Sequence, residues 1–187
     1  MATGKQLLSE YLAALVEGIS QMDLGEKVAW LNDARQALHE ISPFKNEPVD
    51  FVRWVFADRV VANDYNPNSV ARPEMELLHQ SIREDGYTQP IVTVPGGGDN
   101  VVVDGFHRNR IGKEKADIRK RVHGYLPIVA IDKPIEGRMA STIRHNRARG
   151  KHRVDSMGDL VRKLVALGLP DEDIAKRLGM GGEGVLR

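Results

Sequence analysis

The chain has 187 residues, no cysteine and a formal net charge of +1, from 27 basic and 26 acidic residues. This length suits one ordinary domain with an appendage, or two small domains. Without cysteine, disulfides, thiolate metal sites and a cysteine nucleophile are excluded. The chain has neither an apolar run long enough to span a membrane nor the apolar stretch of a signal peptide at its start, so we expect a cytoplasmic protein without a membrane partner.

Two amphipathic helices are predicted for residues 3–40, with Gly25 in the turn between them. Apolar residues recur there at helical spacing, as in Leu8, Leu12 and Leu15. Such a hairpin usually buries its apolar face on the main domain or on a second copy of itself. The prolines and polar residues of 42–48 then predict a linker.

The next ninety residues alternate short β-branched runs with helical spacing, which predicts an α+β core. Glycines and turn residues separate these elements, and the glycine run at 96–98 is read as a hairpin turn because no Lys-Ser or Lys-Thr follows it. The expected elements are one or two strands in 49–61, a helix in 74–83 ended by Gly86, strands at 91–94 and 101–103, a helix continuing over 112–121, a strand at 126–131 and a helix at 136–145.

The stretch 101–112 carries the clearest chemical signal. Three valines predict a buried strand, and Gly105 then breaks it just before a helical segment. A helix start offers free N–H groups and the positive end of a dipole, and Arg108 and Arg110 add donors suited to phosphate oxygens. One interpretation is therefore a polyphosphate site that also contains His107 and Asp104. The other is an ordinary strand-to-helix turn with solvated arginines.

The same stretch, Gly105-Phe106-His107-Arg108-Asn109-Arg110, resembles the glycine and arginine box of ParB N-terminal domains, within the ParB/sulfiredoxin superfamily. Asp104-Gly105-Phe106-His107-Arg108 is also similar to the box of the free serine kinases of that superfamily. Sulfiredoxin chemistry is excluded, because Phe106 stands where that family has its reactive cysteine. The resemblance covers roughly residues 50–180 and implies a small mixed sheet with helices.

Two further segments resemble the ParB pattern. Residues 86–94 are similar to the loop that contacts the nucleotide, which makes Thr88, Gln89 and Pro90 candidate contacts. Residues 145–149 resemble a second box, in which Asn146 would be a Mg²⁺ ligand and Arg149 would reach the phosphates. His145 replaces the glutamate of that box, and oxygen suits Mg²⁺ far better than imidazole does, so the substitution argues against ParB-like CTP hydrolysis.

A basic stretch follows, and a helix-turn-helix-like pair is predicted at the end of the chain. The helix at 171–178 is similar to the first half of such a motif, but the three glycines of 181–184 make a poor recognition helix. The chain stops inside this element, so one expectation is a truncated motif that reads DNA, and the other is a helix pair used only for packing. The residues expected to meet the DNA backbone are Arg144, Arg147, Lys151 and Arg153.

Three functional hypotheses follow from these residues, for a chain divided into a hairpin (1–45), a ParB/sulfiredoxin-like core (49–135) and a C-terminal helical segment (136–187). The first is a ParB-like protein that binds CTP or ATP with Mg²⁺, associates with DNA and forms a homodimeric clamp. The second is a kinase of the free serine type, with Asp104 and His107 as catalytic residues. The third is an inactive interaction module. The sequence leaves open whether a bound nucleotide is hydrolysed or its phosphate is transferred. Arg108→Ala is predicted to abolish nucleotide binding while leaving the fold intact.

Overall fold

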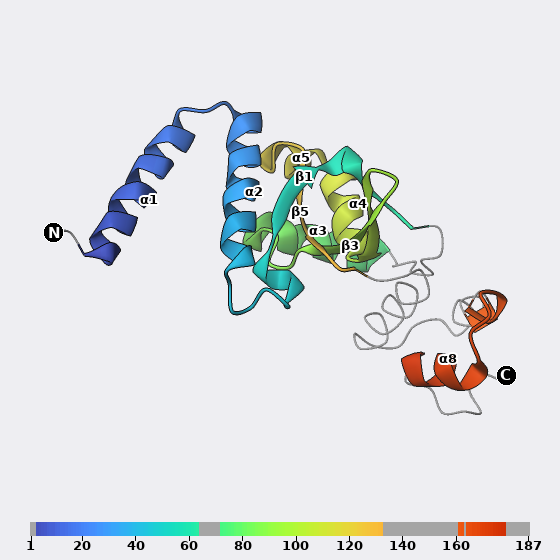
Figure 1. The fold of residues 1–187 in the computed structure, drawn as a ribbon. Helices are drawn as coiled ribbons and strands as arrows, with labels where there is room; N and C mark the ends of the chain where they lie inside the picture. The colour runs from blue at the N-terminus through green and yellow to red at the C-terminus, as the bar shows by residue number, and fades with distance from the viewer. Residues whose placement is uncertain (1–2, 64–71, 133–160, 163, 179–187) are drawn as a thin grey trace. The chain divides into compact units, whose positions relative to one another are not determined.

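The computed structural model describes residues 3–63, 72–132, 161–162 and 164–178 (Figure 1). The chain divides into two compact units, Met1–Trp54 and Val55–Arg187. None of the described helices combines the length and the hydropathy needed to cross a bilayer.

The first unit is the predicted helical hairpin, α1 (Gly4–Ser20) and α2 (Leu24–Glu40). Each helix starts at a side-chain cap: Thr3 forms a capping box with Gln6, and Asp23 accepts from the Glu26 amide at 2.9 Å. The linker then folds back on the end of α2, because the Asp50 carboxylate lies 2.6 Å from His39 Nδ1.

Strand β1 (Arg53–Phe56) starts where this unit ends. The Asn32 side chain of α2 accepts from the Trp54 amide at 3.0 Å and donates to the Trp54 carbonyl at 2.8 Å. One carboxamide therefore replaces a neighbouring strand at this point of the backbone.

The second unit is built on a five-stranded mixed sheet, in the order β1-β5-β3-β4-β2. Strands β3 and β4 form an antiparallel hairpin, and β3 pairs with β5 and β4 with β2 in parallel. The α+β prediction is confirmed. The elements of this unit are η2 (Ala57–Arg59), β2 (Val60–Val61), α3 (Arg72–Asp85), β3 (Ile91–Gly96), β4 (Asp99–Asp104), α4 (Phe106–Glu114), α5 (Ala116–Arg121), β5 (Tyr125–Ala130) and α8 (Asp171–Leu178).

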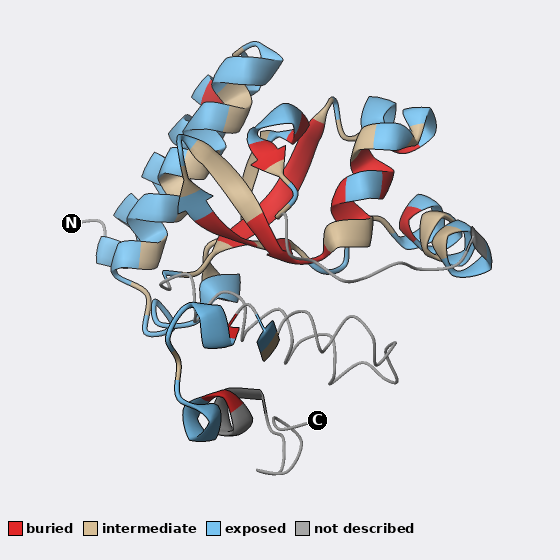
Figure 2. Cartoon of the chain, turned by 90° about the vertical axis from the view of Figure 1, so that its right-hand side faces the viewer, coloured by how far each residue is buried: buried red, intermediate tan, exposed pale blue. Residues whose placement is uncertain are grey.

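Two apolar clusters fix the site-bearing elements. One joins the sheet through Ile91, Val102 and Ile128, and Figure 2 shows buried residues concentrated on these strands. The other joins Ile82 of α3, Ile111 of α4 and Ile118 of α5. Each such side chain contributes about 1.5–3 kcal/mol when fully buried, so the start of α4 is held against both sheet and helices.

Two expected features differ from the structure. The sequence places Gly25 in the turn between the hairpin helices, but it lies in the first turn of α2, which starts at Leu24. The helix expected at 136–145 lies outside the described residues.

The sequence also predicts a continuous helix over 112–121, but the chain leaves the helical conformation at Lys115, with φ −87° and ψ 110°. The break separates α4 from α5. Ile111 and Ile118, which lie on either side of the break, share one apolar cluster with Ile82 of α3.

Candidate functional site

The candidate site lies at the turn from β4 into α4. Gly105 has a φ of 88°, a left-handed conformation that glycine adopts without the steric cost of a Cβ. A Cβ at this position would lie 3.0 Å from the Arg108 guanidinium. Gly105 also has no side chain that could cap α4, so the positive end of this helix faces whatever the turn binds.

Arg108 lies at the centre of this site. Its guanidinium donates to Gln89 Oε1 at 2.9 Å and to Asp104 Oδ2 at 3.2 Å. Arg108 is 9% exposed and Asp104 is 5% exposed. The arginine is therefore not a solvated side chain: one carboxylate and one amide hold it at the helix start. For this reason Arg108→Ala would disturb the fold as well as a ligand, and the expectation of an intact fold needs revision.

The loop 86–90 is fastened to α4 at two points. Gln89 holds the side chain of Arg108, and the Tyr87 hydroxyl donates to the Arg108 carbonyl at 3.0 Å. Thr88 is exposed and Pro90 is half-buried. The structure thus brings four predicted site positions together, namely Gln89, Asp104, Gly105 and Arg108.

The Tyr87 hydroxyl should make stability sensitive to alkaline pH. Burial raises the pKa of this phenol to about 12, although Arg121 and Arg108 act in the opposite direction. The unfolded chain loses the proton near the ordinary value of 10.0, so the free energy of unfolding should fall as pH rises from about 10 to about 12. Urea unfolding of wild type and Tyr87→Phe across this range tests the effect.

At pH 7 the Tyr87→Phe variant should be less stable by about 1 kcal/mol, because it loses one hydrogen bond. Its stability should then change less between pH 10 and 12 than that of wild type. Identical pH slopes for the two proteins would contradict the role given to this hydroxyl.

The remaining residues of the glycine and arginine box lie in different surroundings from Arg108. Arg110 is exposed, and its Nε donates to both Glu114 carboxylate oxygens at 2.9 and 3.0 Å. Residues two positions apart lie about 200° apart around a helix, so Arg108 and Arg110 project from nearly opposite faces. Phe106 packs on the core of the sheet, and the His107 ring meets Phe106 edge-on at 5.5 Å. Phosphate contacts by Arg110 and His107 stay predictions.

Metal and DNA contacts fall mostly on residues outside the described ranges. These are Asn146, Arg149, Arg144, Arg147, Lys151 and Arg153. Within the described residues no group of three His, Asp or Glu side chains is placed to hold a metal ion. Asp104 is an oxygen donor at the turn, but Arg108 already bonds to it, so the described residues do not supply a Mg²⁺ ligand set.

Three features of the site were not predicted from the sequence. Gly112 lies against Tyr87 and Leu126, with no room for a Cβ. Asn109 is 4% exposed, and its Oδ1 has no hydrogen-bond partner in the described structure. Lys113 Nζ donates to the Val60 carbonyl at 2.6 Å and so joins α4 to β2. For two of these features the sequence contains a signal. Asn109 and Gly112 follow Gly105 at helical spacing, which could have indicated that they share one inward face of α4.

The C-terminal segment and the whole chain are each similar to known proteins. Residues 152–187 match the model of the IbrB-like C-terminal HTH domain, which confirms the helix-turn-helix-like prediction for this segment. Solved ParB structures are also similar to the chain. The truncated Caulobacter crescentus ParB complexed with CTP-γ-S is 23% identical, with a TM-score of 0.45, over 72% of this chain and 74% of that one.

The same Caulobacter protein complexed to the centromeric parS site is 19% identical, with a TM-score of 0.49, over 72% of this chain and 68% of that one. A Pnob8-like ParB-N domain is 18% identical, with a TM-score of 0.46, over 67% of this chain and 46% of that one. The uncharacterized protein YbdM of Escherichia coli K12 is 45% identical over 183 residues, which is 97% of this chain and 84% of YbdM. The chain therefore belongs to the same family as YbdM.

Proposed function

We propose that this protein binds a nucleoside di- or triphosphate (CTP, ATP or ADP) at the start of α4 and associates with DNA through its C-terminal segment. The observation that carries the nucleotide proposal is the arrangement of Arg108, with its guanidinium fixed by Gln89 and Asp104 beside the left-handed Gly105. A fixed planar donor at a helix start loses little freedom when it binds an anion.

Electrostatics supports this site as an anion receptor. The free N–H groups and the dipole of α4 favour negative charge at the turn. The Asp104 carboxylate compensates Arg108 when no ligand is bound, and a phosphate group would share the same guanidinium. The sequence resemblance to ParB boxes is what suggests a nucleotide among possible phosphate ligands.

The DNA proposal has separate support. Residues 152–187 are similar to a helix-turn-helix domain, and basic residues such as Arg147 and Lys151 directly precede this segment. A basic cluster on a nearly neutral chain suits contacts with a phosphate backbone, and such binding should weaken steeply with salt.

The geometry favours binding over phosphoryl transfer by Asp104. A general base must be within reach of the attacking hydroxyl, and Asp104 is 5% exposed with its Oδ2 already accepting from Arg108, so a substrate hydroxyl has little access to this carboxylate. Turnover of ATP with free serine would nevertheless identify a kinase, so this assay belongs beside the binding measurements.

Gln89→Ala should weaken nucleotide binding roughly tenfold, because Arg108 loses the acceptor that the Gln89 side chain supplies. Calorimetric titration with CTP and ATP measures the change. Gln80→Ala is the matched control, since the Gln80 amide bonds to Glu84 on an exposed face of α3. The control should bind as wild type does. Equal affinities for Gln89→Ala and Gln80→Ala would exclude a positioning role for Gln89.

A further inference from the structure

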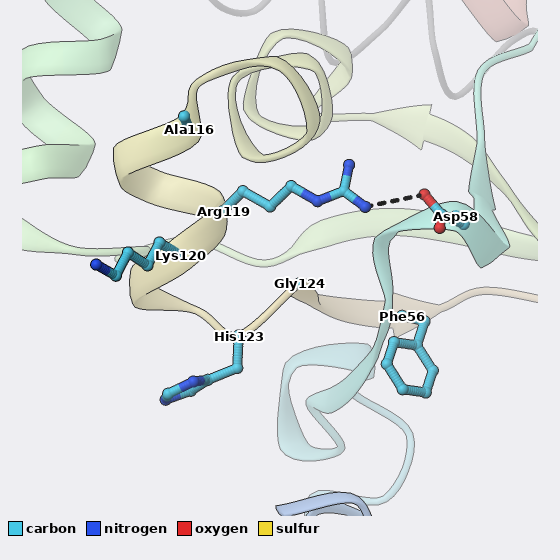
Figure 3. A pocket seen from close by; sticks show the side chains of 7 residues that line it. All are labelled: Phe56, Asp58, Ala116, Arg119, Lys120, His123 and Gly124. Carbon is cyan, nitrogen blue, oxygen red and sulfur yellow. Dashed lines mark ion pairs between the residues drawn. The ribbon is translucent and has the colours of Figure 1, made fainter.

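A hollow of about 550 Å³ lies between η2 and α5, away from the nucleotide site proposed above. Figure 3 shows the Arg119 side chain pointing toward Asp58, while Lys120 and His123 point away from both. These side chains do not converge on one point, so a single small ligand would not contact them together. A larger uncovered surface lies on the N-terminal hairpin.

The hairpin leaves most of its apolar surface exposed. Of the residues of α1 and α2, all of which the structure describes, Ile19 alone is buried. A helix in water owes most of its stability to an apolar face packed on another element. Two helices of 17 residues with one buried side chain between them lack this packing, so we expect a partner to supply it.

The exposed apolar residues of α1 form a stripe along one side of the helix, here called the α1 stripe. Leu8, Leu12 and Leu15 follow at intervals of four and three residues, so they lie within about 60° of one another around the helix axis. Tyr11 and Val16 widen the stripe on its two sides. All of these side chains are exposed, Leu8 at 70% and Leu12 at 61%.

A second stripe, the α2 stripe, is formed by Leu24, Leu31 and Leu38. These exposed leucines follow at intervals of seven residues, which is close to two helical turns. Asn32 and His39 form the hydrogen bonds that fix α2 to the following segment, and they lie about a quarter of a turn away from the leucines. The α2 stripe is therefore not the face that holds α2 in its unit.

The two stripes together are as large as one side of a stable interface. At about 150–250 Å² for each large side chain, the exposed fractions of those in α1 and α2 amount to on the order of 1,000 Å². A specific interface takes about 800 Å² from each partner, whereas monomeric proteins rarely expose contiguous apolar patches above a few hundred Å². The hairpin thus has enough apolar surface for a protein partner.

The charges of α1 argue against a polyanionic partner. The helix contains one cation, Lys5, and two anions, Glu10 and Glu17, which lie on the side opposite the leucines. A helix that binds an anionic membrane or DNA presents several lysines or arginines beside the contact. An apolar stripe with so little positive charge suits another apolar helix, and a second copy of the chain presents such helices.

We propose that the hairpin is a dimerisation element whose partner is the hairpin of a second copy of this chain, with the α1 and α2 stripes buried in a bundle of four helices. A two-fold dimer brings the same patch of both copies together, so each pair of stripes covers the other. Leucines at intervals of three, four and seven residues suit helices that cross at about 20° in such bundles. The dimer forms without nucleotide or DNA, because neither contributes to the stripes.

Sedimentation equilibrium of the full chain, without nucleotide or DNA, tests the proposal, and wild type should be a dimer at micromolar concentrations. Leu8→Gln combined with Leu12→Gln should weaken the dimer roughly a hundredfold, because two apolar side chains of each copy become polar. Leu31→Gln combined with Leu38→Gln should have the same effect. Glutamine is nearly as good a helix former as leucine, and these positions are exposed in the single chain, so both variants should still unfold cooperatively in urea.

Glu10→Gln combined with Glu17→Gln is the matched control, since it changes two residues on the opposite side of α1. This control should dimerise as wild type does. Gln89→Ala should also dimerise as wild type does, which separates the dimer from the nucleotide site.

The proposal is overturned when wild type is monomeric throughout the micromolar range, or when its dimer survives both leucine pairs, because the dimer would then use another surface. Binding of a monomeric wild type to vesicles of phosphatidylglycerol and phosphatidylcholine would also overturn it and assign the stripes to a membrane surface.

Discussion

Replacing Arg108 by methionine is expected to lower the free energy of unfolding by about 3 kcal/mol and to abolish nucleotide binding. The guanidinium is buried and bonded to Asp104, which is 5% exposed. Methionine preserves much of the volume but leaves the carboxylate in a buried place without this partner. Urea unfolding followed by circular dichroism measures the loss.

A double variant distinguishes the fold from the ligand. Asp104→Asn combined with Arg108→Met removes the carboxylate charge that Arg108→Met leaves buried without its guanidinium partner. The double variant should therefore regain a large part of the lost stability. It should still not bind nucleotide, because the anion receptor is gone. An Arg108→Met protein as stable as wild type would show that this ion pair does not hold the turn.

Gly112→Ala should produce the second large effect, a loss of about 2–3 kcal/mol in the free energy of unfolding. Alanine is the better helix former by about 1 kcal/mol, but its Cβ would collide with the Tyr87 hydroxyl and with Leu126. The collision should prevail, because Leu126 is fully buried in the sheet cluster and cannot move aside. Thermal and urea unfolding measure the change.

Gly18→Ala is the control for this substitution. Gly18 also lies within a helix, but nothing lies within 4 Å of a Cβ built on it. The control should be neutral or slightly stabilising. A Gly112→Ala protein as stable as wild type would mean that Tyr87 can leave its position, and the fastening of the 86–90 loop to α4 would then be doubtful.

Much of the fold could be predicted from periodicity and turn residues. The helical spacing of apolar residues indicated the helical hairpin formed by α1 and α2. Gly97 and Gly98, with φ of 60° and 86°, form the expected turn between β3 and β4. The strand-to-helix turn at Gly105 was also predicted correctly. The break at Lys115 was not, because none of the residues 113–121 is a glycine or a proline that would signal the end of a helix.

The site was predicted by residue type but not by contact. The sequence placed Gln89, Asp104 and Arg108 in one candidate site, yet nothing in their spacing showed that the first two bond to the third. The separation of Arg108 from Arg110 follows from helical geometry and could have been predicted from their spacing. The buried Asn109 and the crowded Gly112 depend on the neighbouring loop and sheet, so only the folded chain reveals them.

The most direct measurement is a calorimetric titration of wild type and of the Asp104→Asn/Arg108→Met double variant with CTP, ATP and ADP, each with and without Mg²⁺. We expect wild type to bind at least one of these nucleotides at a single site, and the folded double variant to bind none. Failure of wild type to bind any of the three, or equal binding by the double variant, would contradict the proposed phosphate site at the start of α4.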